Sequence, residues 1–220
     1  LGRLLTIFQK VCDAVAFAHA KGVIHCDLKP ANIMIGEYGE VLVLDWGLAK
    51  YLDDIESDGE SMDEMPQYVP PEKTEGEETS GSLEYDTART TLRFRKRKTV
   101  TGTPAFMAPE LILSLGTQFS GQSDIYALGA ILYLMLTLRP HVDGADLKEL
   151  LHRIVHAEIT PPDAYNEQAS SDGGPQLLHC SEKKIPCILS EAALCALRRD
   201  PSERFPSVRI LQQEVEQYQN

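Results

Sequence analysis

The chain has 220 residues, 43% of them hydrophobic, and a formal net charge of −12 at pH 7. Length and apolar content suffice for one domain with a sizeable core, and the longest uncharged run, residues 125–138, is too short to span a bilayer. The acidity is local, because residues 53–86 hold thirteen acids and one base whereas residues 89–98 hold six bases. Because the basic run adjoins an acidic one, the sequence gives no reason to expect a nucleic-acid partner. The short uncharged run likewise gives no reason to expect a membrane segment within this chain.

The first predicted element is an amphipathic helix over residues 3–20. Its apolar residues recur at steps of four and three, which is the spacing of one helical face. They are Leu4, Phe8, Val11, Val15 and Ala18. Lys21 and Gly22 follow, and glycine suits the left-handed position that ends a helix.

Two short apolar runs then predict a β-hairpin. Residues 32–35 and 41–44 flank the polar, glycine-containing segment 37–40. In such a hairpin Asn32 and Asp45 lie at the two outer ends, where both can face one metal ion.

Periodicity disappears over residues 52–98, where Ser, Glu, Asp, Gly and Pro dominate, so we expect this insertion to be disordered. The elements predicted after it are an all-round apolar helix at 123–137, an amphipathic helix at 145–157, a Pro-, Ser- and Gly-rich loop at 160–186, and closing helices at 190–199 and 206–219. Ser190 and Glu191 offer a start signal for the first closing helix. The predicted fold class is mainly α with a small β-hairpin.

One polar motif stands out by its chemistry. His25-Cys26-Asp27-Leu28-Lys29-Pro30-Ala31-Asn32 is followed, eighteen residues after Asp27, by Asp45-Trp46-Gly47. Asp27 can accept a proton from a substrate hydroxyl, and Lys29 can neutralise a γ-phosphate. Asn32 and Asp45 offer the hard oxygen ligands that Mg²⁺ prefers.

This motif resembles the catalytic loop and the metal-binding triplet of the protein kinase family, with Cys26 for Arg and Trp46 for Phe. Three further stretches match the family in its own order: residues 102–110, ending in Ala-Pro-Glu, residues 123–129 and residues 200–205. The resemblance spans residues 1–220 apart from the insertion. It implies the large lobe of a kinase, with the insertion inside the activation segment.

The resemblance also implies a role for each matching residue. Asp27, as the catalytic base, acts with Lys29, Asn32 and Thr103; ATP is bound by Lys29, Asn32 and Asp45, and Mg²⁺ by Asn32 and Asp45. Structural roles fall to His25, Asp124 and a buried ion pair of Glu110 and Arg204. Thr99 and Thr101 are the candidate phosphorylation sites, with merely solvated threonines as the alternative.

Lys29, two residues after Asp27, is typical in this family of kinases that act on Ser and Thr. The implied function is transfer of the ATP γ-phosphoryl group to a protein substrate, as in bacterial-type Ser/Thr kinases. No Gly-x-Gly-x-x-Gly occurs, and 24 residues precede His25. We therefore expect the small lobe to be absent and the isolated chain to be inactive. A kinase-like binding module or a gene fragment are the alternatives.

The five cysteines include no Cys-x-x-Cys pair. An odd number without close pairing favours reduced thiols, and hence a cytoplasmic protein.

Overall fold

The computed structural model describes residues 1–52, 91–93, 99–101, 104–114, 119–169 and 177–219. Most of the predicted insertion 52–98 and also Thr103 lie outside the described residues. The helices are α1 (Gly2–Ala20), α3 (Pro109–Leu113), α4 (Gly121–Thr137), α5 (Leu147–His156), α6 (Tyr165–Ala169), α7 (Cys187–Ala196) and α8 (Val208–Gln219). The strands are β1 (Val23–Ile24), β2 (Ile33–Ile35), β3 (Val41–Val43), β4 (Lys50–Tyr51), β5 (Thr91–Arg93) and β6 (Thr99–Thr101). The described part is thus mainly helical with small antiparallel sheets, which pair β1 with β4, β2 with β3 and β5 with β6.

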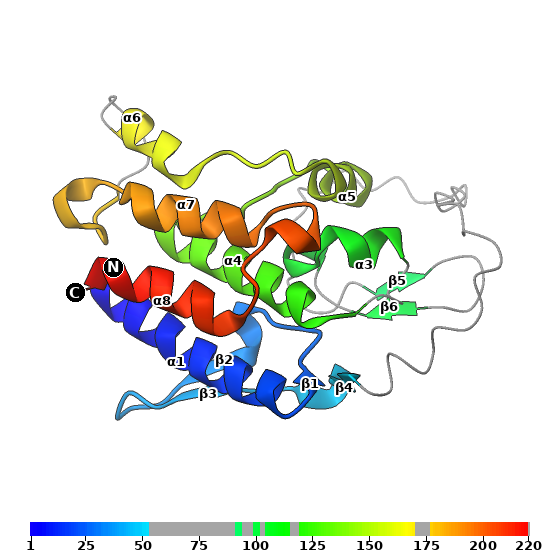
Figure 1. Cartoon of the computed structure of the whole chain (residues 1–220). Helices are drawn as coiled ribbons and strands as arrows, with labels where there is room; N and C mark the ends of the chain where they lie inside the picture. The colour runs from blue at the N-terminus through cyan, green and yellow to red at the C-terminus, as the bar shows by residue number, and fades with distance from the viewer. Residues whose placement is uncertain (53–90, 94–98, 102–103, 115–118, 170–176, 220) are drawn as a thin grey trace.

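Helix α4 forms the centre of the core. It is apolar on all sides, as expected of an enclosed helix, and it packs against α7 and α1 while α8 contacts both of these helices (Figure 1). Gly129 permits the close approach of α7, because a Cβ at this position would lie 2.7 Å from the Cβ of Ala196. The helices therefore enclose one continuous core around α4.

The amphipathic helix predicted at 3–20 is confirmed as α1. Four of the five predicted face residues are buried, and Leu4 is half-buried. The helix ends at Ala20 with Lys21 as its C-cap, and Gly22 follows with a φ of +71°, in the left-handed region that glycine adopts at low cost.

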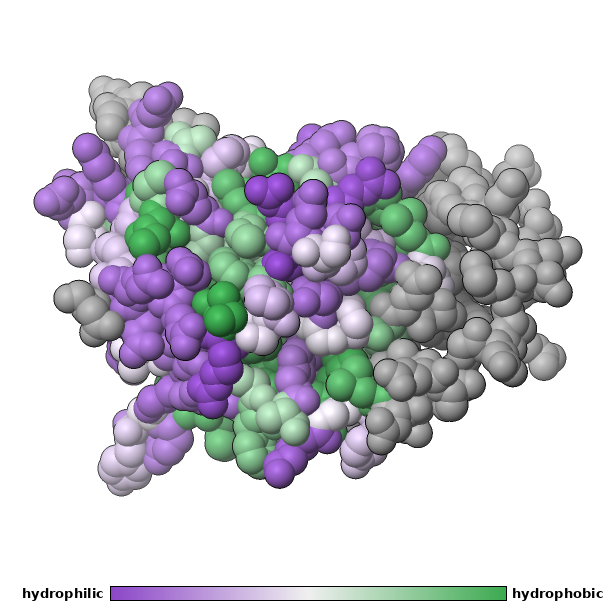
Figure 2. Space-filling model, in the orientation of Figure 1, coloured by the Kyte–Doolittle hydropathy of each residue, from purple (hydrophilic) through white to green (hydrophobic). Residues whose placement is uncertain are grey.

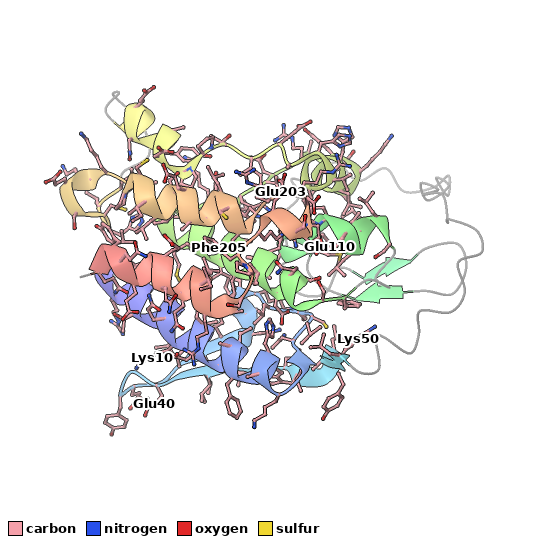
Figure 3. All side chains as sticks on the ribbon, in the orientation of Figure 1. Lys10, Glu40, Lys50, Glu110, Glu203 and Phe205 are labelled. Atoms are coloured by element: carbon pink, nitrogen blue, oxygen red, sulfur yellow. The ribbon has the colours of Figure 1, made fainter. Side chains whose placement is uncertain are left out.

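The predicted hairpin is confirmed as β2 and β3, in which Met34 lies opposite Leu42. Gly39 has a φ of +85° in the connecting turn, and its carbonyl accepts a hydrogen bond of 2.6 Å from Lys10 of α1. Figure 3 shows Lys10 and Glu40 at this end of the hairpin. At the other end the backbone N–H of Leu44 donates to the carbonyl of Asn32 at 2.8 Å. This bond extends the ladder to the residue just before Asp45.

The helix starts predicted at residues 3, 123, 145, 190 and 206 lie one to three residues from the starts of α1, α4, α5, α7 and α8. Helix α4 begins at Gly121, two residues early, because Ser120 and Ser123 form a capping box. Helix α7 begins at Cys187 rather than at Ser190. Ser190 is buried inside α7, where its hydroxyl donates to Asp163 at 2.8 Å, so it makes a tertiary contact instead of capping α7.

The prediction that residues 160–186 form only a loop is wrong. They include α6 and short 3₁₀ turns at Pro162–Ala164 and Ser181–Lys183. The side chain of Asn166 bonds both backbone groups of Ile185, at 2.7 and 3.0 Å, and so holds two parts of the segment together. The predicted insertion also includes a strand, since Thr91–Arg93 pairs with Thr99–Thr101.

His141 is buried in the core beside two tyrosines. Its Nε2 lies 2.9 Å from the hydroxyl of Tyr126, and its ring also meets that of Tyr133 edge-on. Burial disfavours the charged imidazolium and lowers the pKa of His141 to about 3.

This burial predicts acid sensitivity. An unfolded histidine has a pKa of about 6.5, so below that pH the unfolded chain binds a proton that the folded chain does not. The contribution of His141 to stability is complete above pH 6.5 and is lost at about 1.4 kcal/mol per pH unit as pH falls toward 3. Urea unfolding between pH 7 and 4.5 measures this slope. His141→Leu should flatten the slope, whereas Tyr126→Phe should keep it; equal slopes for His141→Leu and wild type would contradict the assignment.

Candidate active site

Asp27, Lys29 and Asn32 form one hydrogen-bonded cluster after β1. Lys29 Nζ lies 2.7 Å from Asp27 Oδ2, and Asn32 Nδ2 donates to the carbonyl of Asp27 at 2.8 Å and to Oδ2 at 3.3 Å. Both side-chain contacts fall on Oδ2, so Oδ1 is the oxygen that these two partners leave free. The spacing of the three residues brings a carboxylate, an ammonium group and an amide to one point.

Asp124 of α4 fixes the backbone that carries this cluster. Its buried carboxylate accepts from the N–H of His25 at 2.8 Å and from the N–H of Cys26 at 3.0 Å. His19 Nε2 lies 2.8 Å from the same carboxylate. Sequence reasoning gave His19 no role in the site, and no local signal marks it, because its partner lies 105 residues away.

His25 links the cluster to the triplet that follows the hairpin. Its Nδ1 accepts from the N–H of Asp27 at 3.2 Å, and its Nε2 lies 3.0 Å from the carbonyl of Leu44. Its ring centroid is 4.5 Å from that of Trp46. The indole N–H of Trp46 donates to the carbonyl of Val43 at 2.9 Å, which satisfies this donor within the hairpin.

Asp45 is exposed and adopts the left-handed conformation, with φ 60° and ψ 63°. Aspartate is among the few residues that tolerate this region. The backbone N–H of Leu44 bonds the carbonyl of Asn32, and Asp45 is the residue after Leu44. Asp45 is therefore one residue along the chain from the partner of Asn32. The amide nitrogen of Asn32 bonds Asp27, which leaves its side-chain oxygen outside that contact; this oxygen and the Asp45 carboxylate are hard oxygens of the kind that could hold Mg²⁺.

Glu110 and Arg204 form a buried bidentate ion pair, with bonds of 2.7 and 2.8 Å. The side chain of Arg204 is fully buried and also donates to three backbone carbonyls. Figure 3 shows Glu110 of α3 beside the segment that carries Glu203 and Phe205, the two neighbours of Arg204. The pair therefore joins the stretch before α8 to α3.

A small pocket lies beside Asp27. Its lining includes Asp27 and Leu28, Phe106 and Met107 from the segment before α3, Leu111 of α3, and residues of α4. Thr99 and Thr101 are described only as backbone of β6.

Cys26 occupies the left-handed position before Asp27, with a φ of 68°. Burial, followed by the charge of Asp124, raises the pKa of its thiol to about 12. The residue is therefore neutral at physiological pH.

The fold and these polar clusters define a protein kinase domain. A family model described as "Protein kinase domain" matches residues 3–87 and 82–215, so the chain belongs to the protein kinase family. It is 34% identical to the serine/threonine-protein kinase PknD of Protochlamydia amoebophila over 98% of this chain and 18% of that protein. PknD of Chlamydia felis is 34% identical over 99% of this chain and 19% of that protein, and PknD of Chlamydia trachomatis serovar D is 33% identical over 97% and 19%.

The chain thus spans about a fifth of the length of these curated relatives. Within the residues that the structure describes, none of the helices is both long enough and apolar enough to cross a membrane.

Proposed function

We propose that the chain takes part in transfer of the γ-phosphoryl group of ATP to a Ser or Thr hydroxyl of a protein substrate. The observation that supports this most is the cluster of Asp27, Lys29 and Asn32, tied to α4 through Asp124. An intact set of base, cation and metal donors favours an enzyme over a non-catalytic binding module. The five free thiols are compatible with a reducing, cytoplasmic setting.

In this proposal each residue has one task. Asp27 accepts the proton of the substrate hydroxyl, and Lys29, already held beside it, neutralises charge on the transferred phosphoryl group. Asn32 and Asp45 hold Mg²⁺, which supplies charge neutralisation to the phosphates when it is bound. Asp124 and His25 position the loop, and the pocket beside Asp27 receives the acceptor segment. Thr103 precedes the pocket residue Phe106 by three positions in the sequence. The family resemblance assigns it to the catalytic residues together with Asp27, Lys29 and Asn32.

We further propose that these 220 residues supply the large lobe, since they contain no glycine-rich phosphate cover. The chain by itself should therefore bind Mg-ATP more weakly than about 1 μM and phosphorylate a generic acceptor protein poorly. Calorimetry with Mg-ATP and a radiolabel transfer assay check this. Sub-micromolar binding or robust transfer by the isolated chain would sink the large-lobe proposal.

Cys26 leads to a prediction about control. The family's arginine here pairs with a phosphorylated residue of the activation segment, because its planar fork binds phosphate through two parallel bonds. A neutral thiol cannot do so, and we expect Thr99→Ala to leave the activity of a protein containing this chain close to wild type. The same substitution on a Cys26→Arg background should lower activity clearly.

Kinase assays on the wild type, Thr99→Ala, Cys26→Arg and the double variant test this prediction. A loss of orders of magnitude from Thr99→Ala alone would overturn it and would point to the bases at 93–98 as the phosphate site. Thr101→Ala, assayed in the same way, distinguishes the two candidate phosphorylation sites on this strand.

A further inference from the structure

His19, in the last turn of α1, contacts the carboxylate that anchors the loop before Asp27. Its Nε2 lies 2.8 Å from Oδ2 of Asp124, and because a carboxylate only accepts hydrogen bonds, this nitrogen carries a proton. The imidazole is 19% exposed, and a Cβ added to Gly121 of α4 would lie 3.2 Å from two of its atoms. The ring therefore fits closely against the start of α4.

Two backbone groups of the loop share the Asp124 carboxylate with this ring. The N–H of His25 donates at 2.8 Å to Oδ2, the oxygen that His19 also contacts, and the N–H of Cys26 donates at 3.0 Å to Oδ1. The carboxylate is 1% exposed, so these donors take the place of water around it. Together they fix the orientation in which the carboxylate meets the loop.

The backbone that this carboxylate holds is strained at Cys26. Its φ of 68° lies in the left-handed region, which a residue of this type adopts rarely and at a cost. Such a conformation persists only where the surrounding contacts over-determine it. Asp27 follows directly, and its N–H donates to Nδ1 of His25 at 3.2 Å, so relaxation at Cys26 would move the proposed base.

We propose that His19 is a positioning residue for Asp27. Its N–H orients the Asp124 carboxylate, and the carboxylate in turn keeps Cys26 in its left-handed conformation. This role rests on the proposed phosphoryl transfer, because only a reaction that uses Asp27 depends on where that side chain lies.

Amide hydrogen exchange of the 220-residue chain tests the positioning without any catalysis. His19→Gln keeps an N–H donor at the reach of Nε2, whereas His19→Asn carries the same amide one methylene shorter. We expect His19→Asn to speed exchange of the His25 and Cys26 amides about tenfold or more, relative to amides at the centre of α4. His19→Gln should stay within about threefold of wild type. Equal exchange of these two amides in wild type and His19→Asn would overturn the proposal.

Asp13→Asn is the control on the same helix. Asp13 pairs with Arg209 of α8 at 2.7 Å, both side chains are 58% exposed, and the surface over α8 is mostly hydrophilic in Figure 2. This variant removes a contact of α1 with another helix, so it should leave exchange of the His25 and Cys26 amides unchanged. Faster exchange of the same size in Asp13→Asn and His19→Asn would show that any loosening of α1 suffices, which would also overturn the proposal.

A second measurement needs no substitution. Long-range ¹H–¹⁵N spectra of the wild-type chain should show a proton on Nε2 of His19 that exchanges slowly with water. A ring that carries its proton on Nδ1 alone would contradict the bond to Asp124 and with it the proposed role.

Kinetics of an active protein that contains this chain test the consequence for catalysis. His19→Asn should lower kcat about tenfold or more and leave KM for ATP within about twofold, because the proposed metal donors are Asn32 and Asp45. His19→Gln should restore kcat. A wild type that transfers no phosphate would refute the proposed function, whereas the exchange data would still decide whether His19 holds the loop. Unchanged kcat in His19→Asn, despite faster exchange of the loop amides, would overturn the link to Asp27.

Discussion

Replacing Asp27 with Asn is expected to lower phosphoryl transfer by roughly 10²–10⁴-fold in an active protein that contains this chain, the range that a positioned general base contributes. Asn keeps the size of the side chain but cannot accept the hydroxyl proton. Binding of Mg-ATP should stay close to wild type, because the proposed metal donors are Asn32 and Asp45. Single-turnover kinetics and nucleotide titration measure the two quantities separately.

Asp45→Asn is the matched comparison, since it makes the same chemical change on the metal side of the site. It should weaken Mg-ATP binding itself, with a steeper dependence on Mg²⁺ concentration. If both variants lose nucleotide binding equally, the division of roles between Asp27 and Asp45 is wrong.

The largest expected effect on stability comes from the ion pair of Glu110 and Arg204. Glu110→Gln should lower the free energy of unfolding by about 3–5 kcal/mol, because it leaves a buried guanidinium without its counter-charge. The carbonyls that Arg204 also bonds cannot replace a carboxylate. Urea unfolding of the 220-residue chain measures this difference.

The neighbouring pair of Arg198 and Glu203 provides a control. Its side chains are 57% and 56% exposed and lie 3.5 Å apart. Glu203→Gln should therefore cost less than about 1 kcal/mol, since solvent screens an exposed pair. Similar losses in Glu110→Gln and Glu203→Gln would show that burial is not what makes the first pair matter.

The sequence predicted most accurately where a pattern is local. The apolar spacing of residues 3–20 predicted α1, and the two short runs around Gly39 predicted the hairpin. The fold around residues 160–190 was predicted poorly. There the contacts of Ser190 with Asp163 and of Asn166 with Ile185 join residues 27 and 19 positions apart. Local composition does not predict contacts over such distances along the chain.

The candidate site divides in the same way. Asp27, Lys29 and Asn32 lie within six residues, so their spacing alone predicted a cluster. The anchoring of that cluster was only partly visible, since Asp124 was expected to have a structural role but its contact with His19 was not foreseen.

The sequence by itself determined the family resemblance, the chemistry of the motif at residues 25–47 and the helices whose apolar spacing is regular, because each depends on residues close together in the chain. Only the tertiary structure decided what holds that motif in place. It also decided which protonation state each buried titratable group adopts. Burial beside Asp124 sets the pKa of Cys26, and burial beside Tyr126 sets that of His141. Desolvation depends on what surrounds a group in space, and those surroundings come from distant segments brought together by the core.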